Sequence, residues 1–201
     1  MTLTGQEFYK SFFCKFQEHV KADSKGYNRT TTDALWTAYI KDFLGKLAMD
    51  LGFNQEKHED VYKIDFDWKR TSDHASVAIE HENDPKDIFK KEVPNLLNTA
   101  AHLKVLITYV KVADFPGDDL ANRVLERLKK EPAFSHEFLL ILGTWSMQEP
   151  TDWVAHLYRP EVTSKTLVFC SNMLEAEKSP GRKARKTRKE TEAGDSESAH
   201  Y

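Results

Sequence analysis

Cysteine is scarce in this chain, and so are long apolar runs. Cys14 and Cys170 are the only two cysteines among 201 residues, too few for a disulfide framework, and we expect both thiols to be reduced. No apolar stretch approaches the roughly 18 residues needed to cross a bilayer. Residues 1–8 lack a basic segment followed by an apolar one, so we expect no secretory signal. These absences predict a cytoplasmic protein with no membrane partner.

The short motifs of several enzyme classes are also missing. The sequence contains no His-Glu-X-X-His, no paired Cys-X-X-Cys and no glycine-rich phosphate loop, which argues against zinc proteases, zinc fingers and P-loop nucleotide-binding proteins. Segment 143–147, Gly-Thr-Trp-Ser-Met, lacks the second glycine of a hydrolase nucleophile elbow. His19, His58 and His102 show no metal-ligand spacing.

Charge is divided unevenly along the chain. The net charge of the chain is −3. Residues 176–201 contain seven Lys or Arg and five Asp or Glu, which leaves 22 basic and 27 acidic residues in 1–175. Segment 176–201 has no apolar periodicity and cannot bury enough surface to fold alone. We therefore predict one globular domain over 1–175 and a charged, disordered tail over 176–201. The acidic domain does not favour tight, non-specific contact with a phosphate backbone.

The first part of the chain has helical periodicity. Apolar residues three to four apart predict an amphipathic helix over 5–21. A second helix is predicted over about 33–51, with a threonine of the run 30–32 as its N-cap and Gly52 at its end. Polar loops are predicted over two segments: 22–29 and 54–60.

The middle and the last part predict a sheet. Alternation of polar and apolar residues predicts strands over 61–69 and 75–83, joined as a hairpin. A helix is predicted over 85–101, in which Pro94 marks a kink or a split. Further elements are predicted as an apolar central strand over 103–112, a helix over 120–130, and strands over 138–145, 153–158 and 166–170. This alternation predicts the α/β class, with a mixed central sheet flanked by helices.

Acidic residues lie at alternate positions on both predicted hairpin strands. Asp65 and Asp67 share one face of their strand, and Glu80 and Glu82 share one face of theirs. A turn centred on residues 72 and 73 places Asp67 nearly opposite residues 79 and 80. A slip of one residue flips a strand, so the sequence leaves open whether the two acidic faces coincide.

Coinciding acidic faces would make a cation site. Three or four carboxylates on one spot are costly unless they are protonated or neutralised by cations. Mg²⁺ or Mn²⁺ is the natural cation for hard oxygen ligands. A metal ion held there polarises a phosphodiester and lowers the pKa of an attacking water.

Three segments carry a resemblance to a known family: Val-Tyr-Lys-Ile-Asp-Phe-Asp-Trp at 61–68, Val-Ala-Ile-Glu-His-Glu-Asn at 77–83 and Lys-Val-Leu-Ile-Thr-Tyr-Val at 104–110. With a predicted helix between the last two, this succession resembles the PD-(D/E)XK nuclease superfamily, which includes type II restriction endonucleases and many repair and recombination nucleases. The resemblance covers 32–112. It implies a restriction-endonuclease-like core, Mg²⁺ or Mn²⁺ as cofactor, and a nucleic-acid partner, DNA ahead of RNA.

The resemblance also implies roles for individual residues. Asp67 or Asp65 is the expected first metal ligand and Glu80 the second. Glu82 stands where the superfamily has the lysine that positions or activates water. Some restriction enzymes of this fold carry Glu there, and a carboxylate can act as a further ligand or as a base. Three neighbouring lysines are candidates for the missing positive charge: Lys63, Lys69 and Lys104.

The resemblance gives two sets of predicted site residues. The predicted catalytic residues are Asp67, Glu80 and Glu82. The predicted metal ligands are Asp65, Asp67 and Glu80.

A structural interpretation of the same residues stays open. Alternating charges are usual on a half-exposed strand, where they pair loosely and contribute little. Against this, residues 80–84 place five polar residues in a row on a strand that should enter the core, which is costly unless a site uses them. Otherwise the strand ends near Glu80 and the rest is loop. His81, on the face opposite Glu80, is predicted to be a hydrogen-bonded structural residue.

Two functions follow from these alternatives. One is metal-dependent hydrolysis of phosphodiester bonds in DNA or RNA. The other is a catalytically inactive binding or scaffold protein on the same fold.

Overall fold

A computed structural model describes residues 2–56, 64–69, 77–114, 116–131, 134–144, 152–160 and 164–167. These residues belong to one compact unit, which runs Met1–Phe169. The predicted tail, 176–201, lies outside the described residues, and so do the predicted strand positions 61–63 and the hairpin turn.

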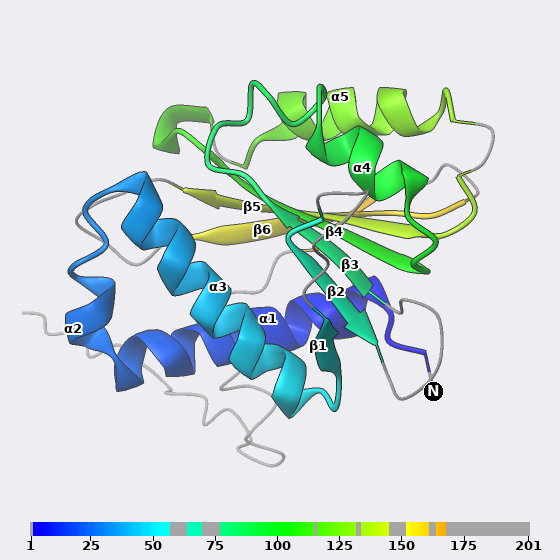
Figure 1. The fold of residues 1–201 in the computed structure, drawn as a ribbon. Helices are drawn as coiled ribbons and strands as arrows, with labels where there is room; N and C mark the ends of the chain where they lie inside the picture. Colours follow the sequence, from blue (N-terminus) through cyan, green and yellow to red (C-terminus); the bar gives the residue numbers. More distant parts are fainter. Residues whose placement is uncertain are drawn as a thin grey trace, which may run out of the picture. The chain divides into compact units, whose positions relative to one another are not determined.

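The described residues alternate between helices and strands (Figure 1). The helices are α1 (Gly5–Ala22), α2 (Ser24–Tyr27), α3 (Asp33–Asp50), α4 (Glu92–Asn98), the 3-10 helix η1 (Val112–Asp114) and α5 (Asp118–Leu128). The strands are β1 (Asn54–Glu56), β2 (Phe66–Lys69), β3 (Val77–His81), β4 (Leu103–Val110), β5 (Glu137–Thr144), β6 (Trp153–Tyr158) and β7 (Ser164–Leu167). The predicted α/β class is confirmed.

One mixed sheet of seven strands forms the centre, and its spatial order is the chain order, β1 to β7. The three central strands, β3, β4 and β5, are parallel. Antiparallel pairs flank them on both sides, β1 with β2 and β2 with β3 on one, β5 with β6 and β6 with β7 on the other. Figure 1 shows α1 and α3 on one face of the sheet and α4 and α5 on the other.

Aromatic residues fill the layer between the sheet and α1. Phe8, Phe12 and Phe16 recur every four residues, so they form one buried stripe on α1. Phe12 meets Phe43 of α3 edge-on at 5.3 Å between ring centroids, and Trp153 of β6 at 5.0 Å. Such aromatic pairs add about 0.5–1.5 kcal/mol each beyond the burial of their area. This stack attaches α1 to both α3 and the sheet.

An aliphatic core fills the layer on the other face. Val93 and Leu96 of α4 and Val124 of α5 are fully buried there, against side chains of β4 and β5. All eight residues of β4 are buried. This confirms the prediction of an apolar central strand, since a strand covered on both faces reads as a continuous apolar run.

Two short elements fall in segments predicted to be loops. In α2, the Asp23 carboxylate caps a single turn by accepting the N–H of Gly26 at 2.9 Å. In β1, Asn54 pairs with Lys69 of β2. A four-residue helix is too short to show a period, and a strand at a sheet edge needs backbone partners more than apolar side chains. Neither element therefore leaves a hydrophobic pattern in the sequence.

The segment after β3 differs most from its prediction. The strand predicted over 75–83 ends at His81, so Glu82 lies beyond it. Turns occupy 85–91, and the predicted helix is reduced to α4. Pro94 is the third residue of α4, where a backbone N–H has no helical partner in any case, so the proline costs no hydrogen bond. The helix is neither kinked nor split at Pro94: it begins two residues before the proline, and turns replace its predicted first half.

Candidate functional site

The register of β2 against β3 brings the two acidic faces together. Asp67 is the cross-strand partner of Ala78, so it lies on the face of the sheet that also carries Glu80. By the same register Asp65, one residue before β2, stands across from Glu80. The prediction that Asp67 lies nearly opposite residues 79 and 80 is therefore wrong by at least one residue, and the acid that faces Glu80 is Asp65.

The aromatic core explains this register. Phe66 pairs with Ile79, and Trp68 pairs with Val77, all on the face opposite the acids. Trp68 is fully buried and meets Phe8 of α1 at 5.5 Å between ring centroids. A slip of one residue would turn the aspartates into this aromatic layer, at a large desolvation cost. Burial of β2 thus fixes where its carboxylates lie.

Asp65 and Glu80 hold each other through the backbone. The Glu80 Oε2 atom accepts the N–H of Asp65 at 3.3 Å, and the Asp65 Oδ2 atom accepts the N–H of His81 at 3.0 Å. Glu80 is 3% exposed, whereas the Asp65 side chain is 24% exposed. We name these two residues the acidic pair. Glu80 is the inner acid of this pair, and Asp65 is the outer acid, nearer the surface.

Helix α4 supports the inner acid. The amide Nδ2 of Asn95 donates to Glu80 Oε1 at 3.2 Å. Burial raises the pKa of Glu80 to about 8; the hydrogen bonds from Asn95 and from the Asp65 N–H oppose this, and the charges of Asp65 and Glu92 add to it. Glu80 therefore holds its proton at neutral pH unless a cation stabilises the carboxylate.

Helix α3 supplies a cation to the outer acid. Lys41 Nζ donates to Asp65 Oδ1 at 2.8 Å, and it lies 5.8 Å from the centroid of the Phe66 ring. Nearby, Asn83 Nδ2 donates to Thr37 Oγ1 at 2.8 Å, which ties α3 to the end of β3. Sequence reasoning missed Lys41 because nothing in the spacing connects it with an aspartate 24 positions later.

The other predicted acids lie apart from the acidic pair. Asp67 is buried on the same face, with its Oδ2 atom 3.7 Å from Lys69 Nζ. Glu82 extends the sheet through its N–H, which donates to Ile107 O at 3.0 Å. Its carboxylate accepts the N–H of Asp84 at 2.9 Å. The structure therefore brings Asp65 together with Glu80, and it gives Asp67 and Glu82 neighbours of their own.

The candidate lysines also have separate places. Lys69 lies beside Asp67, and Lys63 is outside the described residues. Lys104 is buried and donates from Nζ to Leu97 O at 3.0 Å, at the end of α4. Burial lowers the pKa of Lys104. Of the two candidate lysines that the structure describes, neither takes the place beside Asp65 that Lys41 holds.

His81 has the structural role that was predicted for it. Its Nε2 atom lies 2.9 Å from the Tyr109 hydroxyl, on the buried α3 side of the sheet. Burial lowers the pKa of His81 to about 4. The ring is therefore neutral at physiological pH. Its hydrogen bond holds the end of β3 on the face of the sheet opposite the acidic pair.

Carboxylate oxygens, the donors of the acidic pair, are the ligand type that a hard divalent cation prefers. Among the residues that the structure describes, no group of three or more His, Cys, Asp or Glu is arranged to hold a metal ion. Mg²⁺ keeps several waters and takes one or two carboxylates together with substrate phosphates. Asp65 and Glu80 supply two carboxylates on one face of the sheet, and a cation bound here would replace some of the hydrogen bonds that their oxygens now accept.

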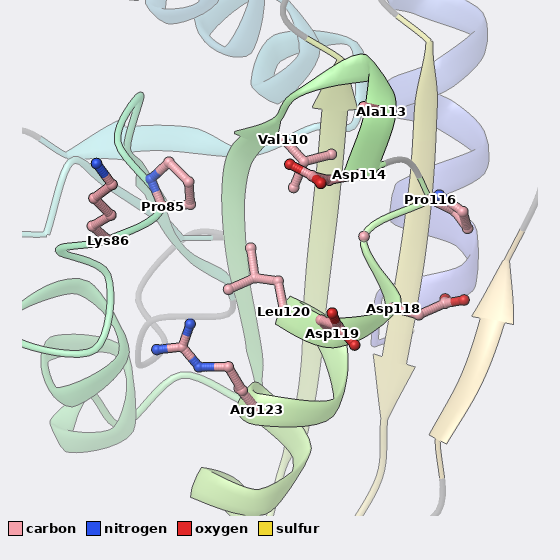
Figure 2. A pocket seen from close by; sticks show the side chains of 11 residues that line it. Pro85, Lys86, Val110, Ala113, Asp114, Pro116, Asp118, Asp119, Leu120 and Arg123 are labelled. Carbon is pink, nitrogen blue, oxygen red and sulfur yellow. The ribbon is translucent and has the colours of Figure 1, made fainter.

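A cavity of about 490 Å³ lies beyond the end of β4. Figure 2 shows Lys86 and Arg123 along one side of it and Asp118 across from them. Neither Asp65 nor Glu80 lines this cavity. Its opposed charges favour no single class of ligand, so the acidic pair remains the candidate site.

Comparison with protein families, with curated proteins and with solved structures finds no match for this chain. No helix in the described part of the chain is long and apolar enough to span a membrane. The site is therefore interpreted from its own geometry.

Proposed function

We propose that this protein hydrolyses phosphodiester bonds in nucleic acid with a divalent cation held by Asp65 and Glu80. The observation that carries the proposal is the placement of these two acids across neighbouring strand ends, on one face of the sheet. Mg²⁺ or Mn²⁺ is the expected cation. We expect DNA rather than RNA as the substrate, because the sequence resembles a superfamily that includes restriction endonucleases and many repair nucleases.

The order of elements supports a restriction-endonuclease-like core. An aspartate stands just before β2, an acid-X-acid segment runs from β3 to just beyond its end, and then α4 and the parallel strand β4 follow. This is the succession of aspartate, acidic strand, helix and further strand on which the resemblance rests. β3 is shorter than the strand predicted over 75–83, but the order of the elements is unchanged.

The residues of the site have distinct tasks in this proposal. A bound cation would polarise the scissile phosphate and lower the pKa of a water. Asp65 and Glu80 hold that cation, and binding it requires Glu80 to release its proton. Asn95 keeps the Glu80 carboxylate aimed at the strand end through its 3.2 Å hydrogen bond. Glu82, two residues further, remains the predicted base.

The test combines metal binding with cleavage. Mn²⁺ is titrated by calorimetry into the wild type, Glu80→Gln and Asp65→Asn, and each protein is then incubated with DNA and with RNA in Mg²⁺ or Mn²⁺. We expect Mn²⁺ binding and cleavage in the wild type only. The matched control is Asp87→Asn, an exposed acid paired with Lys90 at 2.7 Å outside the site, which should behave as wild type. Cleavage that survives in Glu80→Gln would refute the assignment.

One observation favours the second candidate function, an inactive binding or scaffold protein. Both Asp65 oxygens already accept hydrogen bonds, from Lys41 and from the His81 N–H. With Glu80 protonated, the acidic pair is then neutralised without a metal ion. On this alternative, Mn²⁺ binds no more tightly than roughly millimolar, the weak end of carboxylate sites. The same titration decides between the two functions.

A further inference from the structure

Lys41 occupies the position from which a positive charge can serve the acidic pair. Its ammonium contacts Asp65 Oδ1 at 2.8 Å, on the outer acid. The strand position two residues after Glu80 carries Glu82 and supplies no positive charge. A cation near a phosphodiester is needed because negative charge accumulates on the phosphate oxygens in the transition state. Lys41 brings a positive charge from α3 to the acidic pair.

The main chain at Lys41 packs against the core, whereas its side chain is partly exposed. Neighbouring Ile40 and Leu44 are fully buried, so α3 is held against the core. The Asn83 amide contacts Thr37, one turn before Lys41. The Lys41 side chain itself is 43% exposed. An exposed ion pair contributes little to stability, so the contact with Asp65 breaks at small cost.

We propose that Lys41 is a mobile cation shared between Asp65 and the substrate. In the resting protein it neutralises the Asp65 carboxylate. When Asp65 binds a divalent cation, Lys41 leaves the carboxylate and contacts the scissile phosphate. The inference rests on the proposed function, which it deepens by naming the residue that balances the substrate charge.

This role predicts opposite effects on two measurements. In Lys41→Met the side chain keeps its apolar stem beside Phe66 and loses its charge. Mn²⁺ no longer competes with the ammonium for Asp65, so we expect its affinity to rise about three- to fivefold, the scale of an exposed ion pair. Cleavage should fall by about 10²-fold in kcat, as when one donor to a developing charge is removed. Lys41→Arg, which keeps the charge, should regain part of the cleavage.

The matched control lies on the same helix. Lys46 pairs with Asp42 at 2.6 Å and its side chain is 55% exposed, so Lys46→Met removes a similar ion pair away from the acidic pair. It should change neither Mn²⁺ affinity nor kcat. Loss of folding cannot imitate the expected result, because unfolding weakens metal binding and cleavage together.

The outcomes separate this inference from the proposed function. If the wild type binds Mn²⁺ and Lys41→Met binds it equally or more weakly, the shared role of Lys41 is wrong while the metal site stands. Wild-type cleavage rates in Lys41→Met overturn the role as well. If the wild type binds no Mn²⁺ but Lys41→Met does, the competition is supported although the proposed function fails. If neither protein binds it, both proposals fail.

Discussion

Replacing Glu80 with glutamine should stabilise the metal-free protein, and increasingly so as the pH rises. Glu80 has a pKa of about 8 in the folded protein, against an ordinary value of 4.5. Between these two values the folded state binds the proton more strongly than the unfolded state does. Wild-type stability therefore falls as the pH rises through this window, and below pH 4.5 the effect vanishes. Glutamine stays neutral and removes this dependence.

The size of the effect follows from the two pKa values. At 1.36 kcal/mol per pKa unit, their difference corresponds to at most about 5 kcal/mol above pH 8. Water entry and relaxation around a charged Glu80 reduce this, so we expect Glu80→Gln to be more stable by about 2–4 kcal/mol at pH 8.5. For a domain of this size the melting temperature then rises by about 4–16 °C.

The amide can retain the contacts of the carboxyl group. Its oxygen accepts the Asp65 N–H in place of Glu80 Oε2, and its NH₂ group donates to Asn95 once the Asn95 amide turns over. The glutamine can therefore keep both hydrogen bonds of the carboxyl group.

Thermal or urea unfolding in EDTA between pH 5 and 9 measures the effect. The quantity to follow is the difference in unfolding free energy between Glu80→Gln and wild type, because titrations of other groups, such as the neutral buried His81, cancel in it. Asp87→Asn serves as a control with a constant difference over this range, since its pKa lies below it. A difference for Glu80→Gln that is flat with pH, or that favours the wild type at pH 8.5, would refute the reasoning.

Two further predictions concern the metal and the core. Below pH 8 a divalent cation must displace the Glu80 proton, so roughly one proton is released per ion and Mn²⁺ affinity should rise close to tenfold per pH unit between 6 and 8. Calorimetry in buffers of different ionisation enthalpy counts the released proton. An affinity independent of pH contradicts this linkage. Phe12 lies between α3 and β6 with no exposed surface, so Phe12→Ala should cost about 3–5 kcal/mol. Urea unfolding measures this, with the exposed Leu35→Ala, expected to change stability by less than about 0.5 kcal/mol, as the control.

Elements with a strong local period could be predicted from the sequence. Helix α1 matches its prediction to within a residue, since the phenylalanine stripe and the Thr4 cap with Glu7 are local features. Helix α3 begins after Thr32, whose hydroxyl accepts the Leu35 N–H. For the end of β3 the sequence left two alternatives, a strand to residue 83 or an end near Glu80, because the polar run after Glu80 is compatible with both; the strand ends at His81, as in the second.

The acidic pair could be predicted only in part. Asp65 and Glu80 were both named, yet the choice between Asp65 and Asp67 depended on a register that the aromatic core decides. Lys41 and Asn95 come from two helices on opposite faces of the sheet, and neither shares a spacing with the acids. Their proximity arises from the packing of α3 and α4, which no short motif records.

The strand order has a consequence for how the chain is assembled. Because each strand pairs with the next in sequence, the sheet can grow by adding strands at one edge as synthesis proceeds. The parallel strands are joined by crossovers through α4 and α5, which are the longest connections to close. The acidic pair and Lys41 lie on segments that precede β4 in the chain. They can meet before β5, β6 and β7 have been made. The aromatic stack of α1 includes Trp153 of β6, so α1 completes its packing only after β6 has been synthesised.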